Sequence, residues 1–313
     1  MAAMTHTEIR KRGTFRAALA RDKFLLLMFL PGILYYAIFH YGPMYGLVIA
    51  FQNFSPWKGI MGSPFVGFEH FVSFFGSPDF GRLLINTFLL NAYSIIFGFP
   101  VPIIFALLLS EVRDGLYKRI VQSTSYLPHF VSSVVVVGIF VNFLNPSSGI
   151  VNRLLQSVFG LTPINFPGES EWFRTLYTTL TIWARFGWTA IIYIAAITGI
   201  SPTLYEAAVM DGAGRWQRMR YVTLPGIVPT IVIMFLLQIG QIVKVGFETV
   251  YLLQNPANMG TGDVFATFVY RRGIMAMDWS FAAAVGFFES LVGLCFVVIS
   301  NKLARRLGET SLW

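Results

Sequence analysis

The chain has 313 residues, of which 55% are hydrophobic and only 12% are charged. Because soluble domains carry about 25% charged residues, this composition excludes an ordinary soluble domain and predicts a protein that lies in lipid. The net charge of +8 would suit a nucleic-acid-binding protein, but the placement of the cations explains it without any nucleic acid. The single cysteine, Cys295, excludes a disulfide framework within the chain.

Six apolar segments follow one another along the chain, and a helix needs about 20 residues to cross a membrane. They cover 24–40, 83–109, 126–143, 173–198, 227–253 and 281–300. Pro100 and Pro102 are expected to bend the second segment. Apolar pairs that recur every four residues over 150–159 predict an amphipathic helix on the outer surface. The sequence therefore predicts an all-α fold, a polytopic membrane helix bundle of about six transmembrane helices.

The distribution of lysine and arginine sets the predicted orientation. Fifteen of these cations lie at the two ends of the chain and after the second and fourth spans, whereas six lie in the other connections. Because cytoplasmic segments of membrane proteins are enriched in Lys and Arg, the first set is predicted to be cytoplasmic. The chain then divides into a basic cytoplasmic tail (1–23), a transmembrane domain (24–306) and a short cytoplasmic C-terminal tail (307–313).

A polar and basic stretch at 201–225 interrupts the apolar sequence between the fourth and fifth spans. Ser201-Pro202 is a typical helix start, and Gly212 permits a left-handed turn at the end of a short helix. A second short helix over 215–221 is predicted to stop at Leu224-Pro225. Two short helices at an angle would form a compact knob that fits a socket in another protein.

Glu206 has two interpretations within this stretch. It can close a capping box with Thr203 at the start of the first short helix, or it can face a cation of a partner protein. Ala207 and Ala208 beside it are small, so a second surface could approach this part of the helix closely.

The same stretch carries a recognisable order of residues: Glu206-Ala207-Ala208, then Asp211-Gly212, then Val222-Thr223-Leu224-Pro225. This order resembles the EAA loop of bacterial ABC importer permeases, where Ile is usual at the position of Val222. The form with Asp211-Gly212 is closer to the carbohydrate-uptake permeases of MalF/MalG type. Stretches at 97–102, 126–129, 270–273 and 311–313 also resemble the LplB/YteP-like oligosaccharide permeases.

The resemblance implies a function and a set of partners. The chain would be one permease subunit that moves a carbohydrate, an oligosaccharide, across the bacterial cytoplasmic (inner) membrane by alternating access. A second, unlike permease subunit, a cytoplasmic ABC ATPase dimer and an extracytoplasmic solute-binding protein would complete the importer, and ATP hydrolysis would belong to the ATPase. The residues implied in ATPase coupling are Glu206, Ala207, Ala208, Asp211, Gly212, Leu224 and Pro225.

Charged residues inside the predicted spans cost roughly 2.5–3.5 kcal/mol each by insertion scales and usually face the interior of a bundle. Four residues qualify: Arg185, Lys244, Glu248 and Glu289. On the fifth span Gln238, Gln241, Lys244 and Glu248 are spaced by three, three and four residues, which puts them on one face of a continuous helix. One interpretation is that these six residues line the solute path, with Trp183, Trp188 and Asn142 as weaker candidates.

The alternative interpretation is structural pairing, of Lys244 with Glu248 and of Arg185 with Glu289. With a rise of about 1.5 Å per residue, Arg185 lies about 18 Å and Lys244 about 14 Å from the outer surface. Two cations at similar depth, beside amides, predict a solute with carboxylates and hydroxyls, such as a uronate oligosaccharide. Neutralisation of both cations by the glutamates would instead predict a neutral sugar.

Three other functions stay open. A permease of the same class could carry a non-sugar solute, and a secondary transporter or channel would need neither the knob nor an ATPase. The histidines are scattered, and the sequence has no metal-ligand spacing, nucleophile motif or phosphate loop. We therefore expect no catalytic residue, no metal and no cofactor, which counts against a membrane enzyme.

Overall fold

The computed structural model describes residues 23–242 and 244–306. The two predicted tails lie outside the described residues, apart from Lys23. Within the described ranges the chain is almost entirely helical, and its one β-bridge joins Gln52 to Phe65. The all-α fold is confirmed.

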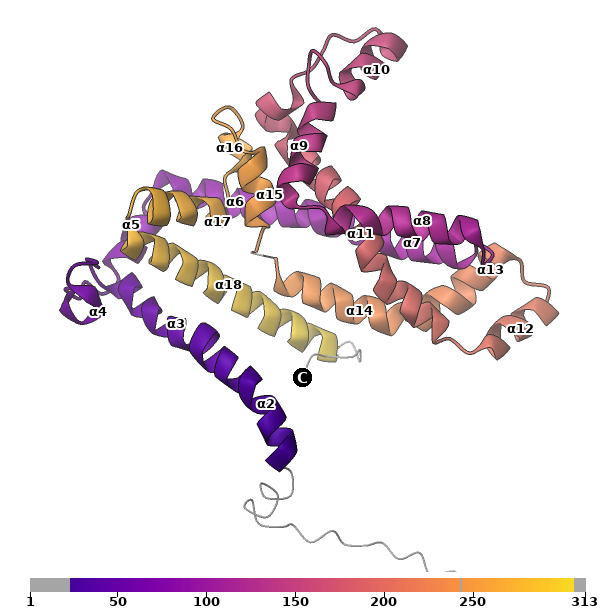
Figure 1. The fold of residues 1–313 in the computed structure, drawn as a ribbon, viewed down its shortest axis with the longest axis horizontal. Coiled ribbons are helices and arrows are strands. Elements are labelled where there is room, and N and C mark those ends of the chain that lie inside the picture. Colours follow the sequence, from indigo (N-terminus) through magenta and orange to yellow (C-terminus); the bar gives the residue numbers. More distant parts are fainter. Residues whose placement is uncertain (1–22, 243, 307–313) are drawn as a thin grey trace, which may run out of the picture.

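Five helical stretches of the described chain are long and apolar enough to cross a membrane (Figure 1): Lys23–Phe51, Pro78–Ser110, Ser170–Thr198, Arg215–Gly240 and Trp279–Lys302. A sixth candidate is a pair of helices, Leu116–Phe130 and Ser133–Phe143, that meet at 106°. The described part thus holds five spans, or six when the bent pair counts as one, in agreement with the predicted bundle.

The first span stands apart from the other helices. It consists of α2 (Lys23–Tyr36), the π turn η1 (Ala37–Tyr41), α3 (Gly42–Met44) and the 3₁₀ segment η2 (Tyr45–Phe51). The helix continues beyond the predicted end because Pro43 lies in the first turn of α3, where its missing N–H is not needed. Every residue from 23 to 45 is exposed, and α2 points away from the bundle (Figure 1). The span contacts the bundle through η2, which packs against α18 (Trp279–Arg306).

The connection to the second span contains α4 (Gly59–Gly62) and α5 (Glu69–Phe75). The second span consists of α6 (Pro78–Tyr93), the π turn η3 (Ser94–Gly98) and α7 (Pro100–Ser110). Because Pro100 has no N–H to donate to the preceding turn, the helix widens there, and the Phe99 N–H donates to the Ser94 carbonyl at 3.1 Å. A π turn precedes the prolines that were predicted to bend the segment, and Pro78–Ser110 remains one span.

The third span is not the continuous helix predicted over 126–143. The chain forms α8 (Leu116–Tyr126) and the 3₁₀ turn η4 (Leu127–Phe130), then turns by 106° into α9 (Ser133–Phe143). Ser132 starts the new helix by accepting a hydrogen bond from the Val135 N–H at 3.4 Å. Pro128 and this cap together favour a break over a straight span.

The predicted amphipathic helix is present as α10 (Ile150–Phe159), which ends at Gly160 in a left-handed conformation. The buried Asn152 holds it, because its amide donates to the carbonyls of Leu144 and Ile164 at 2.9 and 3.0 Å. Two short turns follow, η5 (Phe166–Gly168) and η6 (Ser170–Trp172), and then the fourth span, α11 (Phe173–Thr198). The fourth span has the predicted limits.

The 201–225 loop contains α12 (Pro202–Met210), α13 (Arg215–Arg218) and the π turn η7 (Met219–Thr223), which runs directly into α14 (Leu224–Gly240). The prediction that Leu224-Pro225 stops the second short helix is wrong. Pro225 lies in the first turn of α14, and the wide turn η7 before it accommodates the missing N–H. The chain therefore enters the membrane without leaving the helix.

The fifth span is also broken, where a continuous helix over 227–253 was predicted. α14 ends at Gly240, and a new helix, α15, covers Phe247–Leu253; the described residues between the two are not helical. Gln241 and Ile242 donate only to carbonyls three residues back, and the flanking Gly240 and Gly246 favour such a break. The remaining elements are α16 (Met259–Gly262), α17 (Phe265–Val269), the π turn η8 (Tyr270–Met275) and α18.

The core is divided among several apolar clusters rather than concentrated in one. α11 lies at the centre and packs against α6, α7, α8 and α14. Near its first half, Tyr177 and Leu180 pack with residues of α9 and α15; near its second half, Ala190 and Tyr193 pack with α7 and α14. α11 thus brings both halves of the fifth span into one bundle.

Candidate functional site

The first candidate site is the 201–225 loop, which is described in full. Gly212 has φ +78°, a left-handed conformation that residues with a Cβ rarely adopt, so the predicted turn is confirmed. Behind it the Ala213 N–H donates to the Ala208 carbonyl at 2.9 Å. The Tyr205 and Thr223 hydroxyls lie 3.0 Å apart and join α12 to η7.

The side chains that the sequence singled out lie on the surface of this loop. Glu206, Ala207, Asp211, Gly212 and Pro225 are exposed, and Ala208 and Leu224 are partly buried. Within the loop, Ser201 makes no cap hydrogen bond to α12, since its hydroxyl lies 2.8 Å from that of Thr203. Because Ser201 holds the N-cap position, Thr203 lies inside the first turn of α12 and not at the cap, so the capping box predicted between Thr203 and Glu206 does not form.

The second candidate site is a cavity of about 380 Å³ between α11, the end of α14 and the break in the fifth span. Arg185, Gln238, Gln241 and Lys244 all line it. The predicted continuous helix face does not exist, because the break separates Gln238 from Lys244. The fold nevertheless brings these four predicted residues to one space.

One polar stripe of α11 forms a wall of this cavity. It recurs at every fourth residue: Tyr177, Thr181, Arg185, Thr189 and Tyr193. Residues four apart share a helix face, so this spacing could have identified the stripe from the sequence, but only Arg185 was selected. Asn91 of α6 faces the same cavity, without any periodic signal. The Gly246 backbone lies against the Tyr177 hydroxyl and fixes the end of the break.

A second cavity of about 340 Å³ shares Thr181, Arg185 and Thr189 with the first. Its wall includes His129 and Trp188, whose rings stack at 4.5 Å with an interplanar angle of 6°. A flat aromatic surface of this kind can pack against the apolar face of another ring that enters the cavity. Trp188 is thus placed at a cavity, whereas Trp183 and Asn142 line neither of the two.

The two predicted glutamates do not line either cavity. Glu248 is exposed on α15, and Glu289 is half-buried on α18, near enough to Lys244 for their charges to interact. Across the described residues, no ion pair joins Lys244 to Glu248 or Arg185 to Glu289. The geometry thus gives no support to the predicted structural pairs.

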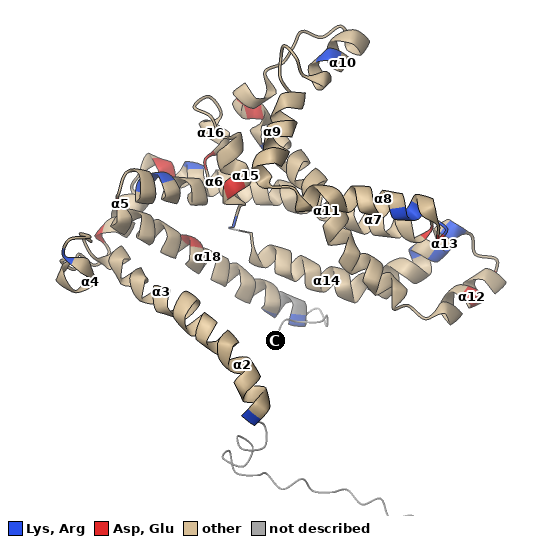
Figure 2. Ribbon diagram, viewed as in Figure 1, with Lys and Arg blue, Asp and Glu red and all other residues tan. Residues whose placement is uncertain are grey.

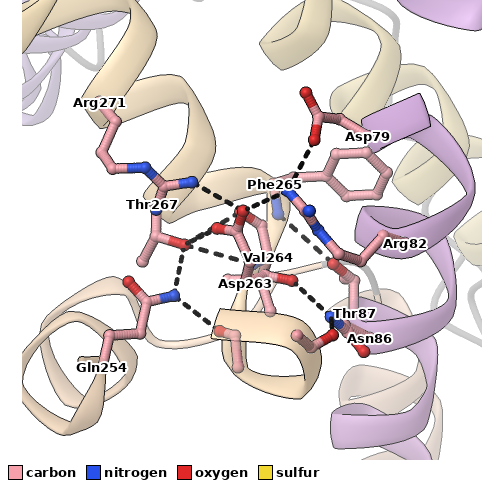
Figure 3. Close-up of polar contacts among 12 residues, drawn as sticks. Asp79, Arg82, Asn86, Thr87, Gln254, Asp263, Val264, Phe265, Thr267 and Arg271 are labelled. Atoms are coloured by element: carbon pink, nitrogen blue, oxygen red, sulfur yellow. Dashed lines mark hydrogen bonds and ion pairs between the residues drawn. The ribbon is translucent and has the colours of Figure 1, made fainter. Parts of the chain in front are cut away.

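A network around the buried Asp263 fixes α15, the second half of the fifth span (Figure 3). The Asp263 side chain is only 1% exposed, and one of its oxygens accepts from Arg271 at 2.7 Å and from Arg82 at 3.2 Å. The Thr267 hydroxyl donates to the other oxygen at 3.1 Å. The Asn86 amide donates to the Asp263 carbonyl at 3.1 Å. We call these five residues the Asp263 network.

The Asp263 network reaches three elements far apart in sequence. Arg82 and Asn86 belong to α6, and Arg174 of α11 donates to the side-chain amide oxygen of Asn86 at 3.1 Å. Gln254, at the end of α15, donates to Thr267 at 3.0 Å. The network therefore ties α15 and its following segment to the second and fourth spans, and it was not predicted from the sequence.

Comparison with known proteins identifies the class of this bundle. Residues 98–309, more than half of the chain, match the family described as binding-protein-dependent transport system inner membrane component. The polygalacturonan/rhamnogalacturonan transport system permease protein YteP of Bacillus subtilis is 46% identical over 97% of this chain and 94% of its own length. Protein LplB of the same organism is 43% identical over 96% of this chain and 94% of its own.

Two solved structures have the same fold. A chain of a bacterial ABC transporter involved in the import of the acidic polysaccharide alginate superposes with a TM-score of 0.85 at 43% identity, covering 93% of this chain and 98% of that one. A second structure, of the bacterial alginate ABC transporter in complex with an alginate pentasaccharide-bound periplasmic protein, gives a TM-score of 0.87 at 41% identity. It covers 96% of this chain and 100% of that one.

Proposed function

The chain belongs to the family of binding-protein-dependent transport system inner membrane components, and from this premise we propose that it is the permease subunit of an ABC importer for acidic oligosaccharides. The observation that carries the proposal is the cavity in which Arg185 and Lys244 meet Gln238 and Gln241. In the described part of the chain, no carboxylate lines this cavity.

The chemistry of the cavity suits a uronate chain. Guanidinium and ammonium groups form charge-assisted hydrogen bonds with carboxylates, and amides and hydroxyls can donate to and accept from sugar hydroxyls. The stacked His129 and Trp188 next to Arg185 offer a flat apolar surface for a sugar ring. The relatives named for polygalacturonan and for alginate support a solute that carries carboxylates.

We infer that the break in the fifth span lies beside the solute. Irregular backbone at membrane depth is tolerated where it lines a cavity, and broken helices at binding sites occur in other transporters. Lys244 lies within the break, and Gln241 is at its start. The alternating movement of the two membrane subunits would expose this cavity to one side and then to the other.

The 201–225 loop is proposed as the contact with a cytoplasmic ATPase dimer, which would hydrolyse the ATP. Its exposed Glu206, Ala207, Asp211, Gly212 and Pro225, with Ala208 and Leu224, would form the docking surface. Figure 2 supports the orientation, because the lysines and arginines of α8 and α13 gather at the same end of the bundle. Both termini would then be cytoplasmic.

We further propose that the chain works with a second, unlike permease subunit and an extracytoplasmic solute-binding protein. The isolated first span supports this, because none of the residues 23–45 is buried against the chain's own bundle, which leaves its flank open to a partner. Native mass spectrometry of the intact complex should find one copy of this chain with one copy of another permease. Two copies of this chain in a functional complex would contradict the proposal.

The solute class is tested with the purified complex in liposomes that contain the solute-binding protein. Uronate oligomers should stimulate ATP hydrolysis, and Arg185→Gln and Lys244→Gln should weaken that stimulation far more than stimulation by neutral oligomers. The Thr179→Ser variant, at an exposed position of the same helix outside both cavities, serves as the matched control. An equal loss with both kinds of oligomer, or no response of the wild type to any uronate, would contradict an acidic solute.

A second candidate solute is a neutral oligosaccharide. It is favoured by one observation, the proximity of Glu289 to Lys244, because a neutralised Lys244 would leave one cation fewer for carboxylates. In that case Glu289→Gln should raise the response to uronates in the liposome assay. If the response to uronates is unchanged in this variant, Glu289 takes no part in the recognition of solute.

A further inference from the structure

The connection between the first and second spans exposes an unusually apolar surface. Trp57 and Met61 are the extreme cases, with 96% and 90% of their surface exposed. The large apolar side chains exposed on this connection are Trp57, Met61, Phe65, Phe68, Val72 and Phe75. An exposed apolar patch of this extent marks a surface that is covered by a membrane or by another molecule.

The part of this connection that carries Trp57 and Met61 is a preformed loop over 52–66. The bridge between Gln52 and Phe65 closes its base. The buried Ser63 joins its two sides, because its hydroxyl donates to the Gly59 carbonyl at 2.6 Å and accepts from the Ser55 N–H at 3.0 Å.

Two further contacts fix the loop. The Gln52 amide donates to the Ile60 carbonyl at 3.0 Å. The Phe54 N–H donates to the Ser280 hydroxyl at 2.9 Å and so attaches the loop to the start of α18. Because its backbone is tied at several points, the loop holds Trp57 and Met61 outward, where the Tyr45 hydroxyl of the first span donates to the Met61 sulfur at 3.6 Å.

The position and charge of the loop indicate what covers it. The first span ends at Phe51 and the second begins at Pro78, so the loop lies where two spans leave the membrane on the same side. The exposed residues 23–45 of the first span lead up to the loop, and Tyr45 at their end contacts Met61. Lys58 is the one charged residue between 52 and 68. Tryptophan beside lysine is the combination that lies at headgroup level at a membrane–water interface.

We propose that the 52–66 loop is an interfacial anchor that inserts Trp57, Met61 and Phe65 into the headgroup region of the predicted outer leaflet, with the Lys58 ammonium at the lipid phosphates. The anchor sets the depth of the first span, whose residues 23–45 are all exposed and which packs against the bundle through η2. This role is independent of which solute crosses the membrane. It concerns a lipid surface and not the solute-binding protein.

The test places a fluorescent probe at the tip of the loop. In the complete complex, Cys295 is replaced by serine, and Met61→Cys or Trp57→Cys is labelled with an environment-sensitive dye in phosphatidylethanolamine/phosphatidylglycerol vesicles. Quenching is measured with lipids spin-labelled near the headgroup, with lipids spin-labelled near the chain end, and with aqueous iodide. Glu169→Cys, an exposed acidic position on another connection, is the matched control, and the complex without an introduced cysteine gives the background.

The proposal expects a blue-shifted emission at both loop positions. The headgroup-proximal spin label should quench them several-fold more than it quenches the Glu169→Cys probe, and iodide should quench them several-fold less. Quenching by iodide equal to that of the control would overturn the anchor. Protection that develops only when the solute-binding protein is added would overturn it in favour of a protein contact. Protection from all three quenchers would overturn it in favour of burial against another subunit.

Discussion

The Asp263 network and the 201–225 loop lie in two connections of the same bundle, and they are built in opposite ways. The network is buried, and its carboxylate is satisfied by Arg82, Arg271 and Thr267 within the chain. The loop exposes Glu206 and Asp211, and its own contacts hold the backbone while its outer side chains remain uncovered. One region is satisfied within the described chain, and the other leaves exposed the surface that we propose as the contact with an ATPase.

This difference predicts how each region responds to substitution. A buried charge that loses its partner costs free energy directly, because the remaining ions have left water without compensation. An exposed loop contributes little to the stability of the bundle but can carry the whole of a contact with another protein. Changes in the network should therefore reduce the amount of folded protein, and changes in the loop should reduce function.

The largest effect on stability is expected for Asp263→Asn. The variant keeps the shape of the side chain but leaves Arg82 and Arg271 without their shared carboxylate. The expected loss is roughly 2–4 kcal/mol, near the lower end for a broken buried pair because both arginines are partly exposed. The melting temperature and the folded yield of the detergent-solubilised complex measure it.

Asp79→Asn is the matched control for this substitution. Asp79 pairs with the same Arg82 at 2.6 Å, but 34% of its side chain is exposed, so the expected change is about 0–1 kcal/mol. Equal melting temperatures for the two variants would show that the burial of Asp263 is not what makes the network stable.

An intermediate effect, on function more than on stability, is expected for Gly212→Val. At φ +78° a Cβ costs about 1–2 kcal/mol, and a β-branched residue fits least, so the turn between α12 and α13 should change shape. Solute uptake and co-purification of the ATPase should fall strongly while the melting temperature of the bundle stays close to that of the wild type. Glu206→Ala should also reduce coupling, without backbone strain.

Gly212→Asn is the matched control, because asparagine tolerates the left-handed conformation far better than valine. It should keep most of the uptake. Normal uptake in both Gly212→Val and Glu206→Ala would remove the basis for a docking role of the loop.

The smallest effect is expected at Asp114, in the connection between α7 and α8. Its carboxylate pairs with Lys118 at 2.9 Å but is 94% exposed. The hydrogen bond from Lys118 and the charge of that residue hold the pKa of Asp114 below its ordinary value of 3.8. Because the folded pKa is lowered, any stabilisation is present above pH 3.8 and is lost as the pH falls through the lowered value. The Asp114→Asn variant should therefore have the same melting temperature as the wild type at neutral pH. A clearly lower melting temperature would contradict the view that exposed ion pairs add little to the stability of this bundle.

Several features of the protein followed from local sequence alone. The apolar length of the fourth span determined α11 between Phe173 and Thr198. The order of residues around Gly212 determined a left-handed turn between two short helices, because the backbone there depends on one glycine and its neighbours. The placement of Lys and Arg predicted an orientation that awaits a direct test.

Other features could not be read from the apolar pattern of the spans. The apolar run of the fifth span hid a break between Gly240 and Phe247, because apolar periodicity does not record where backbone hydrogen bonds stop. The third span likewise turns at Ser132, where Pro128 and the Ser132 cap interrupt an otherwise apolar segment. A spacing argument that assumes continuous helices fails at such breaks, and it failed for the face containing Gln238 and Lys244.

The sequence by itself determined that this chain is a helical membrane bundle with an exposed loop between its fourth and fifth spans. Whether a segment lies in lipid or in water, how long a span is and where a glycine allows a turn are properties of single segments. Composition and spacing are therefore enough to predict them. Only the tertiary structure decided that Asp263 meets Arg82, separated by 181 positions in the chain, and that Arg185 shares a cavity with Lys244. These contacts depend on how separate helices pack, and the packing is set by the shapes of many side chains at once.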